Sequence, residues 1–230
     1  MRVHRLGDVG ILAEPGDLDR VLALDALVRA RREAGDPGLV DVVDVVPAAR
    51  TLMLSADAGA DLSALAASVR ALAAGPEPGA ASDPERSGPG HDAGEPVRIE
   101  VRYDGDDLED VARLAGLEPA QVVAAHTGTT WRAAFGGFAP GFFYLMPHEH
   151  GDPPGDGPTL PSLPRRDEPR TKVPAGAVGL AGEFSAVYPR ASPGGWQLIG
   201  RTDAVMWDVD RDPPALLAPG ALVRFVEVTS

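Results

Sequence analysis

The sequence contains no cysteine and no long hydrophobic run, and each absence excludes a class of protein. Without cysteine, the chain cannot form disulfide bonds, zinc–thiolate sites, iron–sulfur clusters or a thiol nucleophile. No stretch approaches the roughly 18 apolar residues of a membrane-spanning helix. The N-terminal sequence MRVHRLGDVGILAE also lacks the apolar segment and the cleavage site of a signal peptide. We therefore expect a soluble, cytoplasmic protein.

Positive charge is also scarce. The 21 basic residues are outnumbered by 34 acidic residues, which gives a formal net charge of −13 at pH 7. Such a charge opposes non-specific attraction to the phosphates of nucleic acids and to anionic membrane surfaces. The sequence therefore predicts neither a nucleic acid nor a membrane as a partner.

Glycine and proline are abundant, but their excess is local. Residues 75–95 show no hydrophobic periodicity and have almost no large apolar side chain. Because such a segment buries too little surface to offset the entropy of ordering, it is predicted to be a flexible acidic linker. The linker separates a predicted N-terminal domain, residues 1–74, from a second predicted domain, residues 96–230.

The N-terminal domain is predicted to be a small α+β sandwich. Alternating or buried apolar patterns predict strands at 3–6, 9–13, 40–46 and 51–55. Apolar residues at helical spacing predict two helices, one from the N-cap Asp17 to about Glu33 and one that begins at Asp61. Strands with two interspersed helices are typical of such a sandwich.

The second domain is predicted to be a closed or nearly closed β-barrel, which makes the whole chain α+β. A strand at 96–103 and two helices, at 106–115 and from Pro119 to about His126, precede a series of short strands with Gly and Pro turns. These strands are predicted at 130–135, 177–180, 185–188, 197–200, 204–208 and 222–228.

Glycines and aromatic residues are dense in the segment that follows the strand at 130–135. Its sequence GGFAPG, at 136–141, lacks the order of a phosphate-binding loop, and no helical pattern follows it. One interpretation is a tight turn that packs Phe138, Phe142 and Phe143 inward. The other is a turn whose backbone N–H groups face a carboxylate or carbonyl oxygen.

Four basic residues, Arg165, Arg166, Arg170 and Lys172, lie within eight residues of a strongly acidic chain. Arginine forks bind carboxylates and other small anions in a bidentate manner, so the cluster is a candidate anion site. The alternative is that these residues form ion pairs with the protein's own acids. The sequence leaves both interpretations open.

Other candidate catalytic or metal-binding residues have weaker support. Ser192 lacks the Gly-x-Ser-x-Gly elbow of a serine hydrolase. His126 is expected at a helix C-terminus, where a capping role is favoured over acid–base catalysis. His148 and His150 flank Glu149, but without a further ligand we predict no metal site.

Several long segments together resemble one protein family. They are HTGTTWRAAFGGFAPGFFYL, LPRRDEPRTKVPAGAVGLAG, VYPRASPGGWQLIGRT and LLAPGALVRFVEV, together with GDVGILAE and VVDVVPAARTLML in the first domain. The chain resembles the family of the 5-oxoprolinase B subunit, which is also called allophanate hydrolase subunit 1 or the KipI-type kinase-inhibitor family.

The resemblance implies a fold, partners and an activity. The fold is a small α+β domain followed by a cyclophilin-like β-barrel, as in subdomains C and D of a carboxyltransferase. The partners are the 5-oxoprolinase C subunit, which is similar to allophanate hydrolase subunit 2, and the 5-oxoprolinase A subunit, which uses ATP; this chain itself is expected to bind no cofactor. The complex is expected to be a hydrolase of a cyclic amide, which opens 5-oxoproline to glutamate, and the single chain is expected to be inactive alone.

Two alternatives follow from the same resemblance. One is inhibition of a sensor histidine kinase, with the loop from Phe138 to Phe143 as an apolar anchor. The other is a component of an allophanate hydrolase or of a urea carboxylase-type carboxyltransferase, which would require further polypeptides for biotin and ATP.

The resemblance also indicates which residues bind the substrate or an anion. They are Phe138, Pro140, Gly141, Arg165, Arg166, Arg170, Pro174, Gly176, Ser192, Gly194, Gly195, Trp196 and Arg201. The chain departs from the family pattern at Phe184, where members usually have Gln, and in the insert HEHGDPPGDGPT beyond Met146. Both departures bear on the identity of the substrate.

Overall fold

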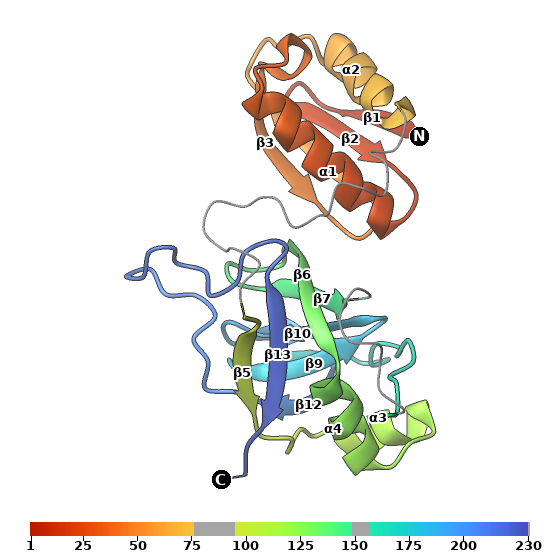
Figure 1. Cartoon of the computed structure of the whole chain (residues 1–230), viewed down its shortest axis with the longest axis vertical. Helices are drawn as coiled ribbons and strands as arrows, with labels where there is room; N and C mark the ends of the chain where they lie inside the picture. Colours follow the sequence, from red (N-terminus) through yellow and green to blue (C-terminus); the bar gives the residue numbers. More distant parts are fainter. Residues whose placement is uncertain (76–94, 149–156, 230) are drawn as a thin grey trace. The chain divides into compact units, whose positions relative to one another are not determined.

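The chain folds as two units, Met1–Pro84 and Glu85–Ser230, in a computed structural model that describes residues 1–75, 95–148 and 157–229 (Figure 1). The predicted linker at 75–95 lies almost wholly outside the described residues, so the domain boundaries stay a prediction. No helix in the described ranges is both long enough and apolar enough to cross a membrane.

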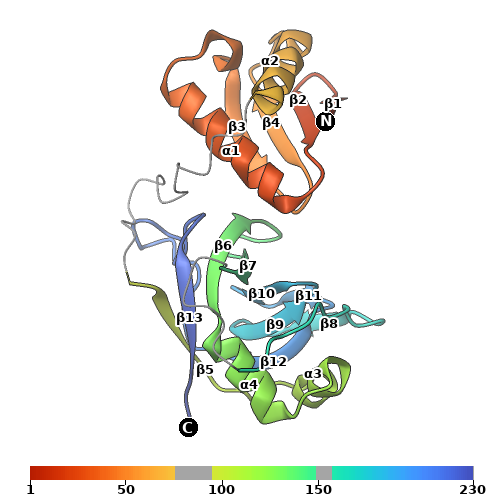
Figure 2. The ribbon, with the colours of Figure 1, turned by 45° about the vertical axis from the view of Figure 1, so that its right-hand side comes forward.

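The first unit is a four-stranded antiparallel sheet that carries two helices on one face (Figures 1 and 2). The strand order in the sheet is β1-β2-β4-β3. The elements are β1 (Arg2–Leu6), β2 (Gly10–Glu14), α1 (Leu18–Glu33), the short 3-10 helix η1 (Pro37–Leu39), β3 (Val42–Pro47), β4 (Leu52–Ala56) and α2 (Leu62–Ala74).

Hydrogen bonds to aspartate side chains explain where both helices begin. Asp17 accepts the backbone N–H of Arg20 at 2.9 Å, and Asp61 accepts the N–H groups of Ser63 and Ala64 at 2.9 and 3.0 Å. These N-caps satisfy donors that a helix leaves unpaired in its first turn. The buried sides of α1 and α2 then pack on the sheet, as the helical spacing predicts.

The second unit is built on a seven-stranded sheet of order β12-β9-β10-β7-β6-β13-β5. Its strands and helices are β5 (Val97–Val101), α3 (Leu108–Ala115), α4 (Pro119–Gly128), β6 (Thr130–Gly136), β7 (Phe143–Pro147), β8 (Arg170–Val173), β9 (Ala177–Ala181), β10 (Phe184–Val187), β11 (Ser192–Gly194), β12 (Gln197–Arg201) and β13 (Leu222–Glu227). All neighbouring strands in the sheet are antiparallel except β13 and β5, which are parallel.

The two edges of this sheet meet and close a barrel. Directly after β5, the backbone of Arg102 exchanges two hydrogen bonds of 2.9 Å with Arg201 at the end of β12. Gly200 makes this approach possible, because a Cβ atom there would collide with the carbonyl group of Arg102. The α+β fold and the barrel expected from the sequence are therefore confirmed.

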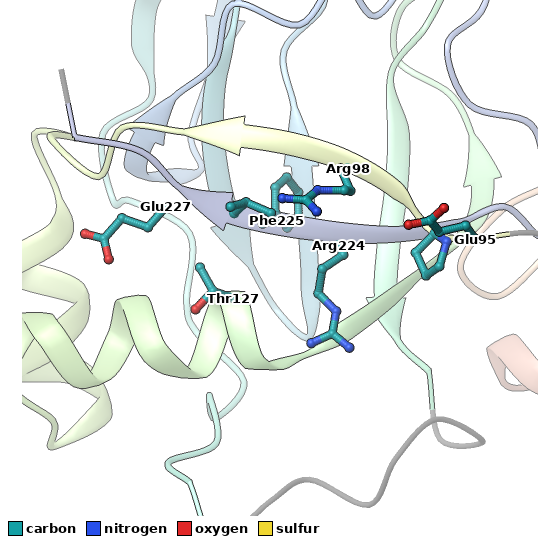
Figure 3. A pocket seen from close by; sticks show the side chains of 8 residues that line it. Glu95, Arg98, Thr127, Arg224, Phe225 and Glu227 are labelled. Carbon is teal, nitrogen blue, oxygen red and sulfur yellow. The ribbon is translucent and has the colours of Figure 1, made fainter.

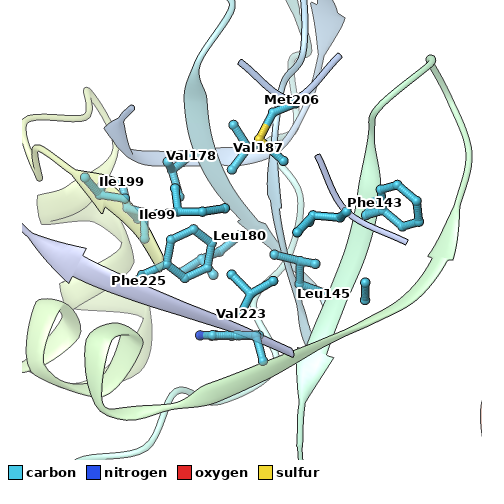
Figure 4. Close-up of a cluster of buried hydrophobic side chains, with 14 of the residues drawn as sticks. Ile99, Phe143, Leu145, Val178, Leu180, Val187, Ile199, Met206, Val223 and Phe225 are labelled. Carbon is cyan, nitrogen blue, oxygen red and sulfur yellow. The ribbon is translucent and has the colours of Figure 1, made fainter. Parts of the chain in front are cut away.

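The interior of the barrel is filled by one apolar cluster (Figure 4). Val178 and Leu180 of β9 point into it together with Val223 and Phe225 of β13, and each of these side chains is at most 3% exposed. The two alanines of β9, Ala177 and Ala181, belong to a second cluster on the opposite side of the sheet. The alternation of a pleated strand thus separates an interior face from an outer face.

Three strands were not predicted, and one predicted strand is wrong. β7, β8 and β11 lie in segments rich in Gly, Pro or charge, and β8 pairs with β11 in a separate two-stranded ribbon. Residues 204–208 form no strand, since their only pairing is an isolated bridge between Trp207 and Ala215. The helices at 108–115 and 119–128 agree with the prediction to within two residues.

Candidate functional site

Five aromatic side chains gather on the outer face of the barrel, over β7, β10 and the turn before β12. Phe142 lies at their centre, with ring centroids 5.4 Å from Tyr188, 5.6 Å from Trp196 and 5.2 Å from Phe138. Tyr144 completes the group, 5.2 Å from Phe142. We name Phe138, Phe142, Tyr144, Tyr188 and Trp196 the aromatic face.

The aromatic face combines buried rings with one exposed ring. Tyr188, Phe142 and Trp196 are at most 4% exposed, whereas the ring of Phe138 is 59% exposed at the rim. Phe138 also has a left-handed backbone, with φ at 69°, which is a rare conformation for a bulky residue. Such strain is a feature of binding and switch sites. Of the two interpretations of this turn, the inward packing holds for Phe142 and Phe143 but is wrong for Phe138.

Glycine is required at two predicted site positions beside this face. Gly141 has φ at 79°, and a Cβ atom there would lie 2.9 Å from the carbonyl oxygen of Met206. A Cβ atom at Gly194 would collide with the hydroxyl of Tyr188. Gly141 therefore lets the 137–141 turn approach the backbone of Met206, and Gly194 lets strand β11 approach the ring of Tyr188.

Two of the clustered arginines bind a buried acid of the protein itself. The carboxylate of Asp107, which is 1% exposed, accepts two bonds of 2.8 Å from Arg170 and one from Nη1 of Arg166. It also accepts the backbone N–H of Leu198 at 2.7 Å. Asp107 is the N-cap residue of α3, but its side chain makes no cap hydrogen bond, because its oxygens already serve these donors. For Arg166 and Arg170, the structure favours ion pairing over an anion site.

The charge of Asp107 is maintained by this arrangement. Burial alone would raise the pKa of its carboxyl group, but the hydrogen bonds from Arg170 and from the Leu198 backbone, with the charges of Arg170 and Arg166, lower it below the ordinary value. The carboxylate therefore stays ionised and links α3, β8 and β12.

Arg165 differs from its two neighbours. It is exposed and forms no ion pair with any described residue. Its positive charge acts on Tyr188 of the aromatic face. Burial nevertheless raises the pKa of Tyr188, so that the phenol stays neutral near pH 7. Arg165 is thus a member of the basic cluster that is available to an anion near Tyr188. Lys172 is also exposed and forms no ion pair with a described residue.

The remaining predicted residues are only partly brought together. Gly195 accepts the backbone N–H of Arg166 at 2.8 Å, which links the basic cluster to the turn before Trp196. Gly176 donates its N–H to the carbonyl oxygen of Tyr188 at 2.8 Å. Arg201, by contrast, pairs with Asp104 at 2.7 Å beside the barrel closure. The other two, Pro140 and Pro174, are exposed turn residues.

His126 lies in the barrel core. Its ring is 0% exposed and is hydrogen-bonded to the hydroxyls of Tyr103 at 2.7 Å and Ser185 at 2.8 Å. The ring stacks on Phe225 with centroids 4.3 Å apart. Burial lowers the pKa of His126 to about 3, so the imidazole is neutral near pH 7. This geometry favours a structural role over acid–base catalysis.

Four further sequence interpretations concern Ser192, Phe184, a metal site and the insert beyond Met146. The hydroxyl of Ser192 is buried without a hydrogen-bond partner, and no described histidine is bonded to it. Phe184 contacts Tyr144 with centroids 5.6 Å apart, at the border of the aromatic face. No described group of three or more His, Asp or Glu side chains could hold a metal ion. His150 and most of the insert beyond Met146 lie outside the described residues.

Sequence reasoning missed two features. Asp107 lay inside the helix predicted at 106–115, and nothing local pointed to partners some 60 residues away. A groove between β5, β13 and the end of α4 was also missed, although Arg98 and Arg224 line it (Figure 3). Neither arginine lies in a glycine-rich or basic segment, so only the strand register brings them together.

The two units have the fold of part of a solved urea carboxylase. The structure superposes on the crystal structure of the Kluyveromyces lactis urea carboxylase with a TM-score of 0.70 and 19% identity, over 99% of this chain and 22% of that one. At this identity the similarity shows the fold alone.

The chain belongs to the family described as carboxyltransferase domain, subdomain C and D, whose family model matches residues 1–217. It is 48% identical to the 5-oxoprolinase B subunit of Escherichia coli over 133 residues, 56% of this chain and 57% of that protein. It is 40% identical to the 5-oxoprolinase B subunit of Bacillus subtilis over 136 residues, 58% of this chain and 53% of that protein. The matches thus span little more than half the length of these relatives. The family resemblance seen in the sequence is confirmed.

Proposed function

We propose that the chain is the B subunit of an ATP-dependent 5-oxoprolinase-type complex. With the A and C subunits, it would convert 5-oxoproline and water to glutamate, coupled to hydrolysis of ATP to ADP and phosphate. The observation that carries this proposal is the identity of 48% and 40% to two proteins named as the B subunit of 5-oxoprolinase.

The chemistry of the substrate fits a subunit that binds rather than one that reacts alone. The lactam of 5-oxoproline is a resonance-stabilised amide, so its opening needs activation, which we assign to the ATP-using A subunit. This chain would bind no cofactor. Consistent with that division, the described residues place no base beside Ser192, and the imidazole of His126 is buried and neutral.

The aromatic face would receive the substrate. The exposed Phe138 can cover the apolar ring carbons of 5-oxoproline. Arg165, which has no ion pair among the described residues, can bind its carboxylate. Arg166 and Arg170 would keep their position on Asp107 and would not contact the substrate.

The test is reconstitution. The A and C subunits from the same genome are purified with and without this chain, and glutamate release from 5-oxoproline is measured with ATP. We expect turnover only when all three are present, and none from the chain alone. If omission of this chain leaves the rate unchanged, the proposal is wrong.

Two other functions have a specific observation in their favour. The exposed, strained Phe138 suits an apolar anchor for a sensor histidine kinase, and kinase autophosphorylation with and without the chain tests this. The fold of urea carboxylase suits a carboxyltransferase component. In that case, amide-dependent turnover should be abolished by avidin, which binds biotin, whereas 5-oxoprolinase activity should not change.

A further inference from the structure

A groove on the outer surface of the barrel runs along β13, between β5 and the end of α4 (Figure 3). Its volume is about 430 Å³, which falls within the range of small-molecule sites, roughly 300–1,000 Å³. The residues around it that bear charge or a hydroxyl are Glu95, Arg98, Thr127, Arg224 and Glu227. The strands of this groove are different from those that carry the aromatic face.

Two arginines lie side by side in this groove. In the parallel pairing of β5 and β13, Arg98 is the register partner of Arg224. Ile99 and Phe225, the next residues on each strand, point into the barrel core, so both arginines point outward. Figure 3 shows them between Glu95 at one end of the groove and Glu227 at the other.

The charges of these arginines are not neutralised within the described part of the chain. Arg98 forms no hydrogen bond or ion pair there, and Arg224 donates only one long bond of 3.4 Å, to the carbonyl oxygen of Gly128 at the end of α4. In the same barrel, Arg102 pairs with Asp203 at 2.7 Å, and Arg201 pairs with Asp104. Two like charges on adjacent strands repel each other, and an anion between them would offset that repulsion.

The other groups of the groove limit the size of the anion. Glu95 and Glu227 line the ends of the groove, but no ion pair joins either of them to Arg98 or Arg224 in the described structure. Carboxylates at both ends would repel an extended polyanion. The hydroxyl of Thr127 already donates to the carbonyl oxygen of Val123 at 2.8 Å, so the two guanidinium groups are the available side-chain donors.

We propose that Arg98 and Arg224 form a binding site for a small oxyanion, either phosphate or a carboxylate. Each guanidinium offers a planar fork of N–H donors that matches two oxygens of such a ligand. The site is separate from the function proposed above, because it shares no residue with the aromatic face or with the basic cluster around Asp107.

The test is titration of the full-length protein with two probes, inorganic phosphate and glutarate, at constant ionic strength maintained with KCl. Binding is followed by isothermal titration calorimetry. Saturable binding of phosphate alone identifies a phosphate site, and saturable binding of glutarate alone identifies a carboxylate site. Either result supports the proposal when the binding depends on both arginines.

Three variants show whether the groove is responsible. Arg98→Gln and Arg224→Gln should each raise the dissociation constant about tenfold, because each removes one charged guanidinium group. Arg132→Gln is the matched control, since Arg132 lies on β6 opposite Leu222, outside the groove residues, and should leave affinity unchanged. In buffer without phosphate or carboxylate, Arg98→Gln should not lower the urea midpoint, because it removes a repulsion and no hydrogen bond or ion pair of the described residues.

Two results would overturn the proposal. One is the absence of saturable binding of both probes by the unmodified protein. The other is equal affinity in the unmodified protein and in Arg98→Gln. If a glutamine variant fails to fold, Arg98→Lys and Arg224→Lys keep the charge but lose the planar fork. They should still bind more weakly than the unmodified protein, and unchanged affinity in both would also contradict the assignment.

Discussion

The carboxylate of Asp107 stabilises two arginines that have no other acidic partner at comparable distance among the described residues. Asp106 contacts Arg170 only at 3.8 Å. Asp107→Asn would leave Arg166 and Arg170 with uncompensated charge in a partly buried position, so we expect a loss of about 3 kcal/mol in the free energy of unfolding. The measurement is urea unfolding followed by tryptophan fluorescence, which reports on the barrel alone because all three tryptophans lie in it.

The control for this change lies in the first turn of the same helix. Asp110→Asn removes a solvent-exposed partner of Arg113 and should change stability by less than about 0.5 kcal/mol. Equal effects of the two substitutions would show that the buried ion pairs do not stabilise the barrel.

The buried imidazole of His126 predicts a dependence of stability on pH. The unfolded chain binds a proton on this residue below about pH 6.5, whereas the folded chain does so only near pH 3. The stabilisation is therefore fully present above about pH 6.5 and is lost as the pH falls toward 3, by at most about 1.4 kcal/mol per pH unit. His126→Gln should flatten the pH profile of the urea midpoint between pH 4 and pH 6, while an unchanged slope would contradict the assignment.

For single residues, the sequence identified the charged side chains of interest but not the groups that they contact. The cluster of Arg165, Arg166 and Arg170 was visible, and both of its interpretations were reasonable. Which one applies depends on Asp107, whose contacts are non-local and follow from how α3 packs against β12. Similarly, the expected helix C-terminal position of His126 was correct, but its burial depends on Phe225, about 100 residues later in the chain.

Among the elements, the closure of the barrel depends on β12. Gly200→Ala would place a methyl group against the carbonyl of Arg102 and would separate the last strand from the residue after β5. We expect the free energy of unfolding to fall by about 2 kcal/mol, as it does when a side chain is added at a site that cannot relax. The measurement is again urea unfolding by tryptophan fluorescence.

Gly128→Ala provides the comparison for that substitution. It lies at the end of α4 with open space around it, and it should be neutral or slightly stabilising. If Gly128→Ala lowered the free energy of unfolding as much as Gly200→Ala, any added methyl group would destabilise the unit.

Elements with strong periodicity were predictable, and elements fixed by pairing were not. Asp17, Asp61 and Pro119 marked the starts of three helices correctly, since caps act locally. β8 and β11 have no alternating pattern, because they form a short ribbon with a bulge between Ser192 and Gly194. Residues 204–208 alternate like a strand, yet the chain there pairs only through Trp207.

For the whole molecule, the proposed function predicts how one arginine affects the assembled complex. Arg165→Gln should raise the KM for 5-oxoproline about tenfold in the complex with the A and C subunits, because it removes a cation near Tyr188 that has no ion pair among the described residues. The measurement is the initial rate of glutamate release against substrate concentration. Arg113→Gln, an exposed change on α3, is the control and should leave KM unchanged; a normal KM in Arg165→Gln would remove Arg165 from the substrate site.

The position of β13 also determines the order in which this protein can fold during synthesis. β13 lies between β5 and β6, two strands made much earlier, and it is the last described strand of the chain. A ribosome must therefore release residues up to Glu227 before β5 gains its neighbour in the sheet, whereas the first unit needs only residues up to Ala74. Because non-local pairing of this kind is slow and leaves strand edges exposed, the barrel unit should be the one that needs protection by chaperones.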